Sequence, residues 1–163
     1  MPEDAVTLQG VLADRDAWST ANCPVGRSME LIGTRSAMLL MREAYYGTTR
    51  FDDFARRVGV TEAVAAARLR ELTEAGLLRR EPYREPGQRT RHEYRLTDMG
   101  RDLAPVVLGL YQWGVKYLAG GRPMPRLRHA DCGSDVHVTV TCAEGHDVPL
   151  REVDVEPARR PSL

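Results

Sequence analysis

The sequence predicts a mainly helical α+β fold: a winged helix-turn-helix with N-terminal helices, a long C-terminal dimerisation helix and a small β-hairpin tail. Three observations predict it. Two helical segments, 51–58 and 62–75, follow each other across a short turn. Two strand-like segments, 77–83 and 92–96, come next and flank an arginine-rich loop. Apolar residues then recur at spacings of three and four from 103 to 117, which is typical of a helix with one apolar face.

The first helix is predicted from three apolar residues that would share one buried face, Phe51, Phe54 and Val58. Thr49 is expected to cap this helix, because Asp52 stands three residues later and completes a pattern like a capping box. These signals place the first helix of the pair directly after the threonine.

The second helix has clear signals at both ends. Gly59 is expected to end the first helix, Thr61 to cap the second, and Gly76 to end it. An inward row is predicted for Ala65, Leu69 and Leu72. The opposite side of this helix is then free to enter a major groove about 12 Å wide, provided that the pair forms a helix-turn-helix.

The hairpin carries arginines on both sides of a Pro86-Gly87 turn signal, from where they could reach phosphates or a minor groove. A small core with a solvated arginine loop is the alternative interpretation, since short helix pairs are common. The predicted DNA-binding residues lie before the first helix, along the second helix and in the hairpin loop. They are Arg50, Thr61, Glu62, Arg68, Arg70, Gln88, Arg89 and Arg91.

At these residues the chain resembles the HxlR family of bacterial transcription regulators, within the MarR-like winged-helix proteins. The resemblance covers about 23–118, in segments whose order and spacing match. They are Cys23-Pro24-Val25, Leu31-Ile32-Gly33, Arg50-Phe51-Asp52-Asp53-Phe54, Arg68-Leu69-Arg70-Glu71-Leu72, Glu74-Ala75-Gly76-Leu77-Leu78, Glu93-Tyr94-Arg95-Leu96-Thr97 and Gly100. The resemblance implies a homodimer whose two recognition helices meet the half-sites of a pseudo-palindromic operator in double-stranded DNA.

The chain departs from the family pattern in two places. Thr34-Arg35-Ser36 stands where the family usually has an aromatic residue after the glycine that corresponds to Gly33. The family's recognition helix usually opens with polar residues, whereas 63–67 here is Ala-Val-Ala-Ala-Ala. Alanine can only contact a thymine methyl group, so the sequence predicts sparse base reading.

The C-terminal helix is predicted to begin at the Thr97-Asp98 cap and to run to about Leu118, with Pro105 near its first turn or at a kink. Its apolar stripe needs a partner, and a homodimer interface is preferred over packing on its own chain. The predicted dimerisation residues are Leu103, Val106, Val107, Leu110, Trp113 and Tyr117.

The rest of the chain is predicted to form an arm, two further helices and a tail. Residues 1–22 form an arm with a short helix at 14–19, and the winged domain with its dimerisation helix spans 23–121, with helices at 24–31 and 36–45. Residues 122–163 form a linker, a hairpin and a disordered end. Alternating valines at 136–140 predict one strand of that hairpin, and a return strand is expected at 148–155.

Charge and composition indicate a cytoplasmic protein with no membrane partner. The net charge is zero, yet residues 50–101 hold 12 arginines against 9 acidic residues. No run approaches the roughly 18 apolar residues of a membrane span, and the first residues are acidic where a secretory signal is basic. The three cysteines agree with a reducing compartment.

The tail contains four residues of the kinds that bind zinc: His129, Cys132, Cys142 and His146. Relatives with a similar tail often have cysteine knuckles at these places, but Gly145 stands where the resemblance leads one to expect a second knuckle cysteine. A hairpin without metal is therefore favoured over a zinc site, and no cofactor is expected.

Cys23 is the candidate redox sensor, because a thiol just ahead of Pro24 at a helix start feels the positive end of the helix dipole, which favours the thiolate. Some proteins of the family use a cysteine near the N-terminus to sense oxidants or electrophiles. The competing interpretation is a small buried cysteine that fills space.

The sequence therefore predicts a homodimeric DNA-binding transcription regulator without enzymatic activity, since it contains no nucleotide-binding loop and no catalytic motif. It could respond to thiol modification or to a small-molecule effector bound between the dimer helix and the Met38–Met41 layer. The alternative is a winged-helix protein-interaction module that does not bind DNA, as the alanine-rich helix and zero net charge would allow.

Overall fold

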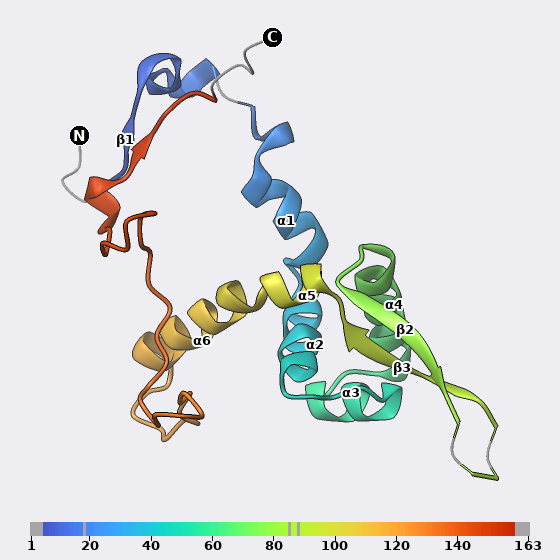
Figure 1. The fold of residues 1–163 in the computed structure, drawn as a ribbon. Coiled ribbons are helices and arrows are strands. Elements are labelled where there is room, and N and C mark those ends of the chain that lie inside the picture. The colour runs from blue at the N-terminus through green and yellow to red at the C-terminus, as the bar shows by residue number, and fades with distance from the viewer. Residues whose placement is uncertain (1–4, 18, 85, 88, 159–163) are drawn as a thin grey trace. The chain divides into compact units, whose positions relative to one another are not determined.

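The computed structural model describes residues 5–17, 19–84, 86–87 and 89–158, which form two compact units. The described residues within 24–137 form the larger unit, and those within 5–23 and 138–158 form the smaller one. The sequence analysis divided the chain differently, into three segments at 1–22, 23–121 and 122–163. Each unit is described by itself (Figure 1).

The larger unit is a helical domain with one antiparallel hairpin. Its helices and strands are α1 (Pro24–Ile32), α2 (Arg35–Tyr45), α3 (Phe51–Val58), α4 (Glu62–Glu74), β2 (Leu78–Tyr83), β3 (Arg91–Leu96), α5 (Asp98–Asp102) and α6 (Ala104–Leu118). The helix pair and the hairpin predicted from the sequence are thereby confirmed, and the fold is a winged helix-turn-helix.

The core of this unit lies where α2, α3, α4 and the base of the hairpin meet. Phe54 is fully buried and meets the Tyr94 ring edge-on, with ring centroids 6.1 Å apart. Leu69 and Leu72 are buried as predicted, and Leu40 and Met41 of α2 pack in the same cluster. The helix-turn-helix is therefore fixed in place by α2 behind it.

Helix ends follow the sequence signals in most places. The Thr61 hydroxyl accepts a hydrogen bond from Val64 N at 3.3 Å, and Gly59 ends α3 with φ +71°. The cap predicted at Thr49 is wrong, because α3 begins at Phe51 and its N-cap residue is Arg50, whose side chain makes no capping bond.

The helix predicted from Thr97 to about Leu118 forms in two parts, and the break lies beside Pro105, which was expected near the first turn or at a kink. It is divided into α5 and α6 at Leu103, and Pro105 lies in the first turn of α6. A continuous helix would lack the Pro105 N–H and would press the proline ring against the carbonyl group four residues earlier. The break therefore follows from Pro105.

The hairpin predicted for the tail does not form as a strand pair. Residues 128 and 135, and residues 141 and 147, make isolated bridges, and Val140 is 66% exposed. An alternating pattern needs a surface to cover before it stabilises a strand, and Val136 and Val140 remain exposed. The tail contributes one strand to the smaller unit, β4 (Asp154–Val155), which pairs in parallel with β1 (Thr7–Leu8).

The smaller unit otherwise consists of loops and short 3-10 helices, Gly10–Ala13, Arg15–Ala17, Thr20–Asn22 and Leu150–Glu152. The helix predicted at 14–19 is reduced to one 3-10 turn at Arg15–Ala17, and Trp18 lies outside the described residues. Among the residues that the model describes, no helix is both long and apolar enough to cross a membrane.

Candidate nucleic-acid interface

The recognition helix α4 presents a mixed face to solvent. Ala63, Val64 and Ala66 are exposed near its N-terminus, together with Glu62. The Thr61 oxygen is occupied as the helix cap. This end of α4 can therefore offer van der Waals contacts and one carboxylate to a base edge, but few hydrogen-bond donors.

Both arginines predicted on α4 lie on its accessible side and pair with acidic residues of the same helix. Arg68 donates a hydrogen bond to Glu71, and Arg70 Nε lies 3.9 Å from Glu74 Oε1. The Arg70 side chain is 69% exposed, whereas Arg68 is half-buried. Exposed pairs of this kind are weak, so a phosphate can displace the carboxylate.

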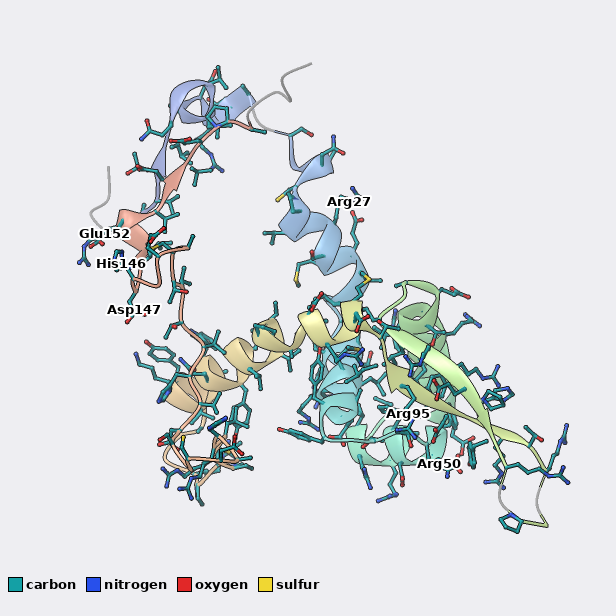
Figure 2. All side chains as sticks on the ribbon, viewed as in Figure 1. Arg27, Arg50, Arg95, His146, Asp147 and Glu152 are labelled. Carbon is teal, nitrogen blue, oxygen red and sulfur yellow. The ribbon has the colours of Figure 1, made fainter. Side chains whose placement is uncertain are left out.

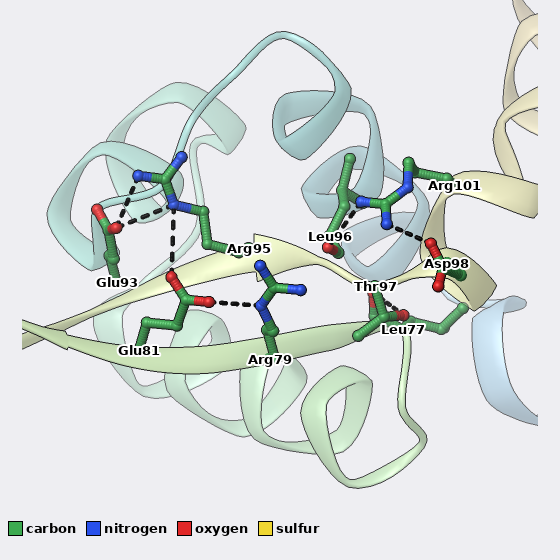
Figure 3. Close-up of polar contacts among 9 residues, drawn as sticks. All are labelled: Leu77, Arg79, Glu81, Glu93, Arg95, Leu96, Thr97, Asp98 and Arg101. Carbon is green, nitrogen blue, oxygen red and sulfur yellow. Dashed lines mark hydrogen bonds and ion pairs between the residues drawn. The ribbon is translucent and has the colours of Figure 1, made fainter.

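The hairpin carries a network of ion pairs that occupies two of its arginines (Figure 3). Arg79 faces Arg95 across the strands, and Glu81 faces Glu93. Like charges in opposite positions would repel, but Glu81 pairs with both arginines, and Arg95 Nη2 lies 2.8 Å from Glu93 Oε1. The Arg95 hydrogen bond lowers the pKa of Glu93. These residues stiffen the wing.

A polar hollow of about 530 Å³ lies between the start of α3 and the wing, and arginines from three elements line it. Arg50 comes from the N-cap of α3, Arg80 from β2 and Arg91 from β3. The Arg50 guanidinium stacks 3.2 Å above the centre of the Tyr83 ring. Figure 2 shows that Arg50 and Arg95 lie at the base of the wing. With three arginines against Asp52 in its lining, the hollow carries a net positive charge beside the start of α3.

The basic residues of this hollow that sequence reasoning missed are Arg80 and His92. Arg80 Nη2 lies 3.1 Å from His92 Nδ1, so the two side chains are held together across the strands. The arginine count of the hairpin pointed to this region, but it could not separate the arginines that are paired with acids from those that are not.

The tip of the wing is the least engaged part of the predicted interface. Arg89 and Arg91 are exposed and form no ion pair with the described residues. Gln88, which was also predicted to contact DNA, lies outside those residues. Two long cationic side chains are thus available beyond the ion-pair network.

The predicted dimerisation residues fall into two groups. Leu103 and Val107 pack against the core of their own unit, whereas Val106, Leu110, Trp113 and Tyr117 are at least half exposed along α6. The rings of Trp113 and Tyr117 lie together, with centroids 5.6 Å apart. An apolar stripe therefore remains uncovered on α6.

The three cysteines lie in different surroundings. Cys23 stands directly before α1, as predicted, and is partly buried. Cys132 and Cys142 are exposed. Hydrogen bonds from Ser134 and His129 lower the pKa of Cys132 to about 7, and backbone bonds from His146 and Glu144 lower the pKa of Cys142. The surroundings of these two thiols, which sequence reasoning treated as zinc candidates, therefore favour the thiolate.

The four zinc candidates form two local pairs. His129 Nδ1 lies 3.2 Å from Cys132 Sγ in the larger unit, and Cys142 N donates to His146 O at 3.0 Å in the smaller one. Over the described ranges, no group of three or more potential ligands is placed to hold a metal ion.

Known proteins with similar sequences are regulators. A model described as an HxlR-like helix-turn-helix matches residues 31–121. The chain is 42% identical over 135 residues to an uncharacterised HTH-type transcriptional regulator of Mycobacterium tuberculosis, covering 82% of this chain and 84% of the relative. It is 34% identical over 96 residues to YdeP, another such regulator, of Bacillus subtilis, covering 58% of this chain and 73% of the relative.

Solved structures show the same architecture. The fold of the candidate transcription factor PA1607 superposes with a TM-score of 0.75 at 36% identity, covering 83% of this chain and 95% of that one. The redox regulator HypR in its reduced form superposes with a TM-score of 0.52 at 33% identity, covering 57% and 91%. The family consists of transcription regulators rather than enzymes. By sequence and by its winged helix-turn-helix, the chain belongs to the HxlR-like helix-turn-helix family of transcription regulators.

Proposed function

We propose that the protein acts in the cytoplasm as a homodimer that binds a pseudo-palindromic operator in duplex DNA and regulates transcription. The observation that carries this proposal is the hollow beside the start of α3, in which Arg50, Arg80 and Arg91 converge. In this fold, a helix is expected to contact bases in the major groove, and a cationic wing is expected to contact the flanking phosphates.

The test is fluorescence anisotropy with labelled DNA from upstream of the protein's own gene, measured at two salt concentrations against a scrambled duplex. Operator binding should be tighter than scrambled binding at both concentrations, and both affinities should fall steeply with salt as counterions are released. Equal affinity for both duplexes, or no binding, would favour the alternative, a protein-interaction module. That alternative draws on the alanine-rich face of α4 and on the pairing of Arg68 and Arg70 within the helix.

The wing supplies the first prediction. Arg89→Ala or Arg91→Ala should weaken binding to operator and scrambled DNA alike, and should make the slope of log affinity against log salt shallower by about one unit, because one phosphate contact is lost. Arg79→Ala is the matched control, since Arg79 is already paired with Glu81. A slope that is unchanged in the Arg89 and Arg91 variants would place the wing away from DNA.

The recognition helix supplies the second prediction. At least one of Arg68→Ala and Arg70→Ala should reduce operator affinity, by about 1–3 kcal/mol if the lost contact is to guanine. Glu74→Gln should act in the opposite direction, because it releases Arg70 from its partner on the helix. Anisotropy at fixed salt measures all three variants. Wild-type affinity in both arginine variants would show that α4 does not enter the groove.

Thiol modification is the third prediction, and it concerns Cys23 at the start of α1. In a background that lacks Cys132 and Cys142, we expect a quinone to weaken operator binding in the protein that retains Cys23 and to spare Cys23→Ser. Restoring Cys132 alone measures the response of the thiol that His129 and Ser134 activate. If the protein with Cys23 and the Cys23→Ser variant respond equally, Cys23 is a packing residue.

A further inference from the structure

A second cavity, of about 300 Å³, lies inside the larger unit between α2 and α6. This volume is at the lower end of the range of small-molecule sites. The DNA-contact residues predicted above do not line it. Its lining includes Arg35, Met38, Leu39, Arg42, Tyr45, Tyr46 and Tyr111.

The walls of this cavity favour an aromatic ligand. Aliphatic side chains and Met38 line much of it, and three tyrosines add ring faces and edges. Two of the tyrosine hydroxyls are already used, because Tyr45 donates to Gly100 O at 2.7 Å and Tyr111 donates to Pro125 O. These two rings therefore offer the ligand mainly apolar contact.

The polar end of the ligand is indicated by Arg42. Its Nη2 donates to Glu43 Oε1 at 2.7 Å, but its Nε is buried and has no hydrogen-bond partner among the described residues. A buried N–H without an acceptor is unfavourable. A carboxylate that reaches this guanidinium would supply the missing acceptor and its charge complement. Arg35, on the same wall, adds a second positive charge.

Arg42 is also the first member of a polar chain that leads to the helix-turn-helix. Its partner Glu43 is buried, and Thr48 donates to Glu43 Oε2 at 3.3 Å. Arg57 of α3 in turn donates to the Thr48 hydroxyl at 2.6 Å. Thr48 is itself buried. A change in the Arg42–Glu43 hydrogen bond can therefore reach α3, the first helix of the helix-turn-helix, through direct hydrogen bonds.

We propose that this cavity binds a small aromatic carboxylate, with its ring between α2 and α6 and its carboxylate on Arg42, and that binding alters operator affinity through the Glu43–Thr48–Arg57 chain. The regulatory half rests on the proposed DNA binding, whereas the binding half does not. A ligand that contacts Arg42 changes the hydrogen-bond partners of Glu43. It therefore binds with different affinity when the Arg42–Glu43 bond is intact and when it is broken, and such a difference is what coupling between two sites requires.

The binding half is tested by calorimetric titration of the full chain with 2-naphthoate and, as an uncharged match, 2-naphthalenemethanol. We expect one naphthoate per chain and at least tenfold weaker binding of the alcohol. Leu39→Trp should abolish naphthoate binding by filling the cavity, and Arg42→Met should weaken it at least tenfold. Arg27→Met, on α1 outside the cavity (Figure 2), is the matched control and should bind like wild type. Circular dichroism checks that each variant folds.

Three results would overturn this half. They are no naphthoate binding at millimolar concentration, equal binding of acid and alcohol, and unchanged binding by Arg42→Met. Binding by a Trp113→Asp variant that light scattering shows to be monomeric, but not by a dimeric wild type, would also overturn it, because the partner's side chains would then occupy the cavity.

The regulatory half is tested by operator anisotropy with and without saturating naphthoate. We expect the operator Kd to change at least fivefold. Thr48→Val should bind naphthoate like wild type but lose this change, and Thr48→Ser, which keeps the hydroxyl, should restore it. An unchanged operator Kd in wild type, or an unaltered response in Thr48→Val, would refute the coupling. A protein that binds naphthoate but no DNA would instead refute the proposed function and leave the cavity site standing.

Discussion

Replacing Gly100 with alanine is expected to lower the free energy of unfolding by about 1–3 kcal/mol or more, the cost of overpacking a filled site. Gly100 is buried in α5, and a Cβ there would collide with the Leu77 carbonyl oxygen, lie 3.1 Å from the carbonyl carbon and lie 3.2 Å from Leu96 Cδ2. The clashing atoms belong mainly to the Leu77 backbone at the start of the wing, and backbone atoms cannot move away by a rotamer change as a side chain can.

The clash would reach beyond α5, because Gly100 connects three elements. Its carbonyl oxygen accepts the Tyr45 hydroxyl from α2, and its N–H donates to the Thr97 cap at 3.1 Å. Shifting Gly100 to admit a methyl group would strain both bonds. We therefore expect the wing and α2 to lose stability together, in one cooperative transition.

Gly114→Ala is the matched control, since both glycines are helical. A Cβ at Gly114 would meet nothing within 4 Å, so alanine should stabilise the protein there by about 0.5–1 kcal/mol through helix propensity. Urea unfolding followed by circular dichroism measures both variants. A Gly100→Ala variant as stable as wild type would mean that α5 is not held against Leu77.

Trp113→Asp is expected to convert the proposed dimer to monomers and to weaken operator binding at least a hundredfold. The Trp113 side chain is about half exposed on the apolar stripe of α6 and lies against Tyr117. In a dimer interface a carboxylate at this position would be desolvated without a partner. Each monomer would then bind one half-site, without the added affinity of a second, tethered contact.

Light scattering after size exclusion measures the mass of the variant, and anisotropy measures its operator affinity. Gln112→Asp adds the same charge one residue away, turned about 100° around the helix axis, and should remain dimeric. A folded Trp113→Asp protein that is still a dimer would place the interface elsewhere. A monomer that keeps wild-type operator affinity would show that dimerisation is not required for binding.

Much of the winged domain could be predicted because its signals are local. Phe54 and Val58 of α3, and Leu69 and Leu72 of α4, recur at helical spacing and are buried. Thr61 and Gly59 act within one turn of their own helices, so neighbouring residues alone were enough to predict where α4 begins and α3 ends. Where a pattern had two local explanations, prediction failed. Thr49 looked like a cap, but Arg50 holds that position.

The candidate site was harder to predict, because charge in the sequence does not reveal pairing in space. Arg68 and Arg89 look equivalent along the chain, yet Arg68 is paired with Glu71, whereas Arg89 has no ion-pair partner among the described residues. The same reason explains the thiols. Cys132 owes its lowered pKa to hydrogen bonds from Ser134 and His129, which only a folded turn brings to the sulfur.

By itself, then, the sequence determined which segments become helices or strands in the winged domain, because burial periodicity and capping act over a few residues. Tertiary structure alone decided three other things. It left Val136 and Val140 of the tail exposed, assigned Leu103 and Val107 of the apolar stripe to the core, and brought Arg42 of α2 beside a cavity shared with α6. Each depends on which distant residues become neighbours, and contacts of that kind carry no periodic signal along the chain.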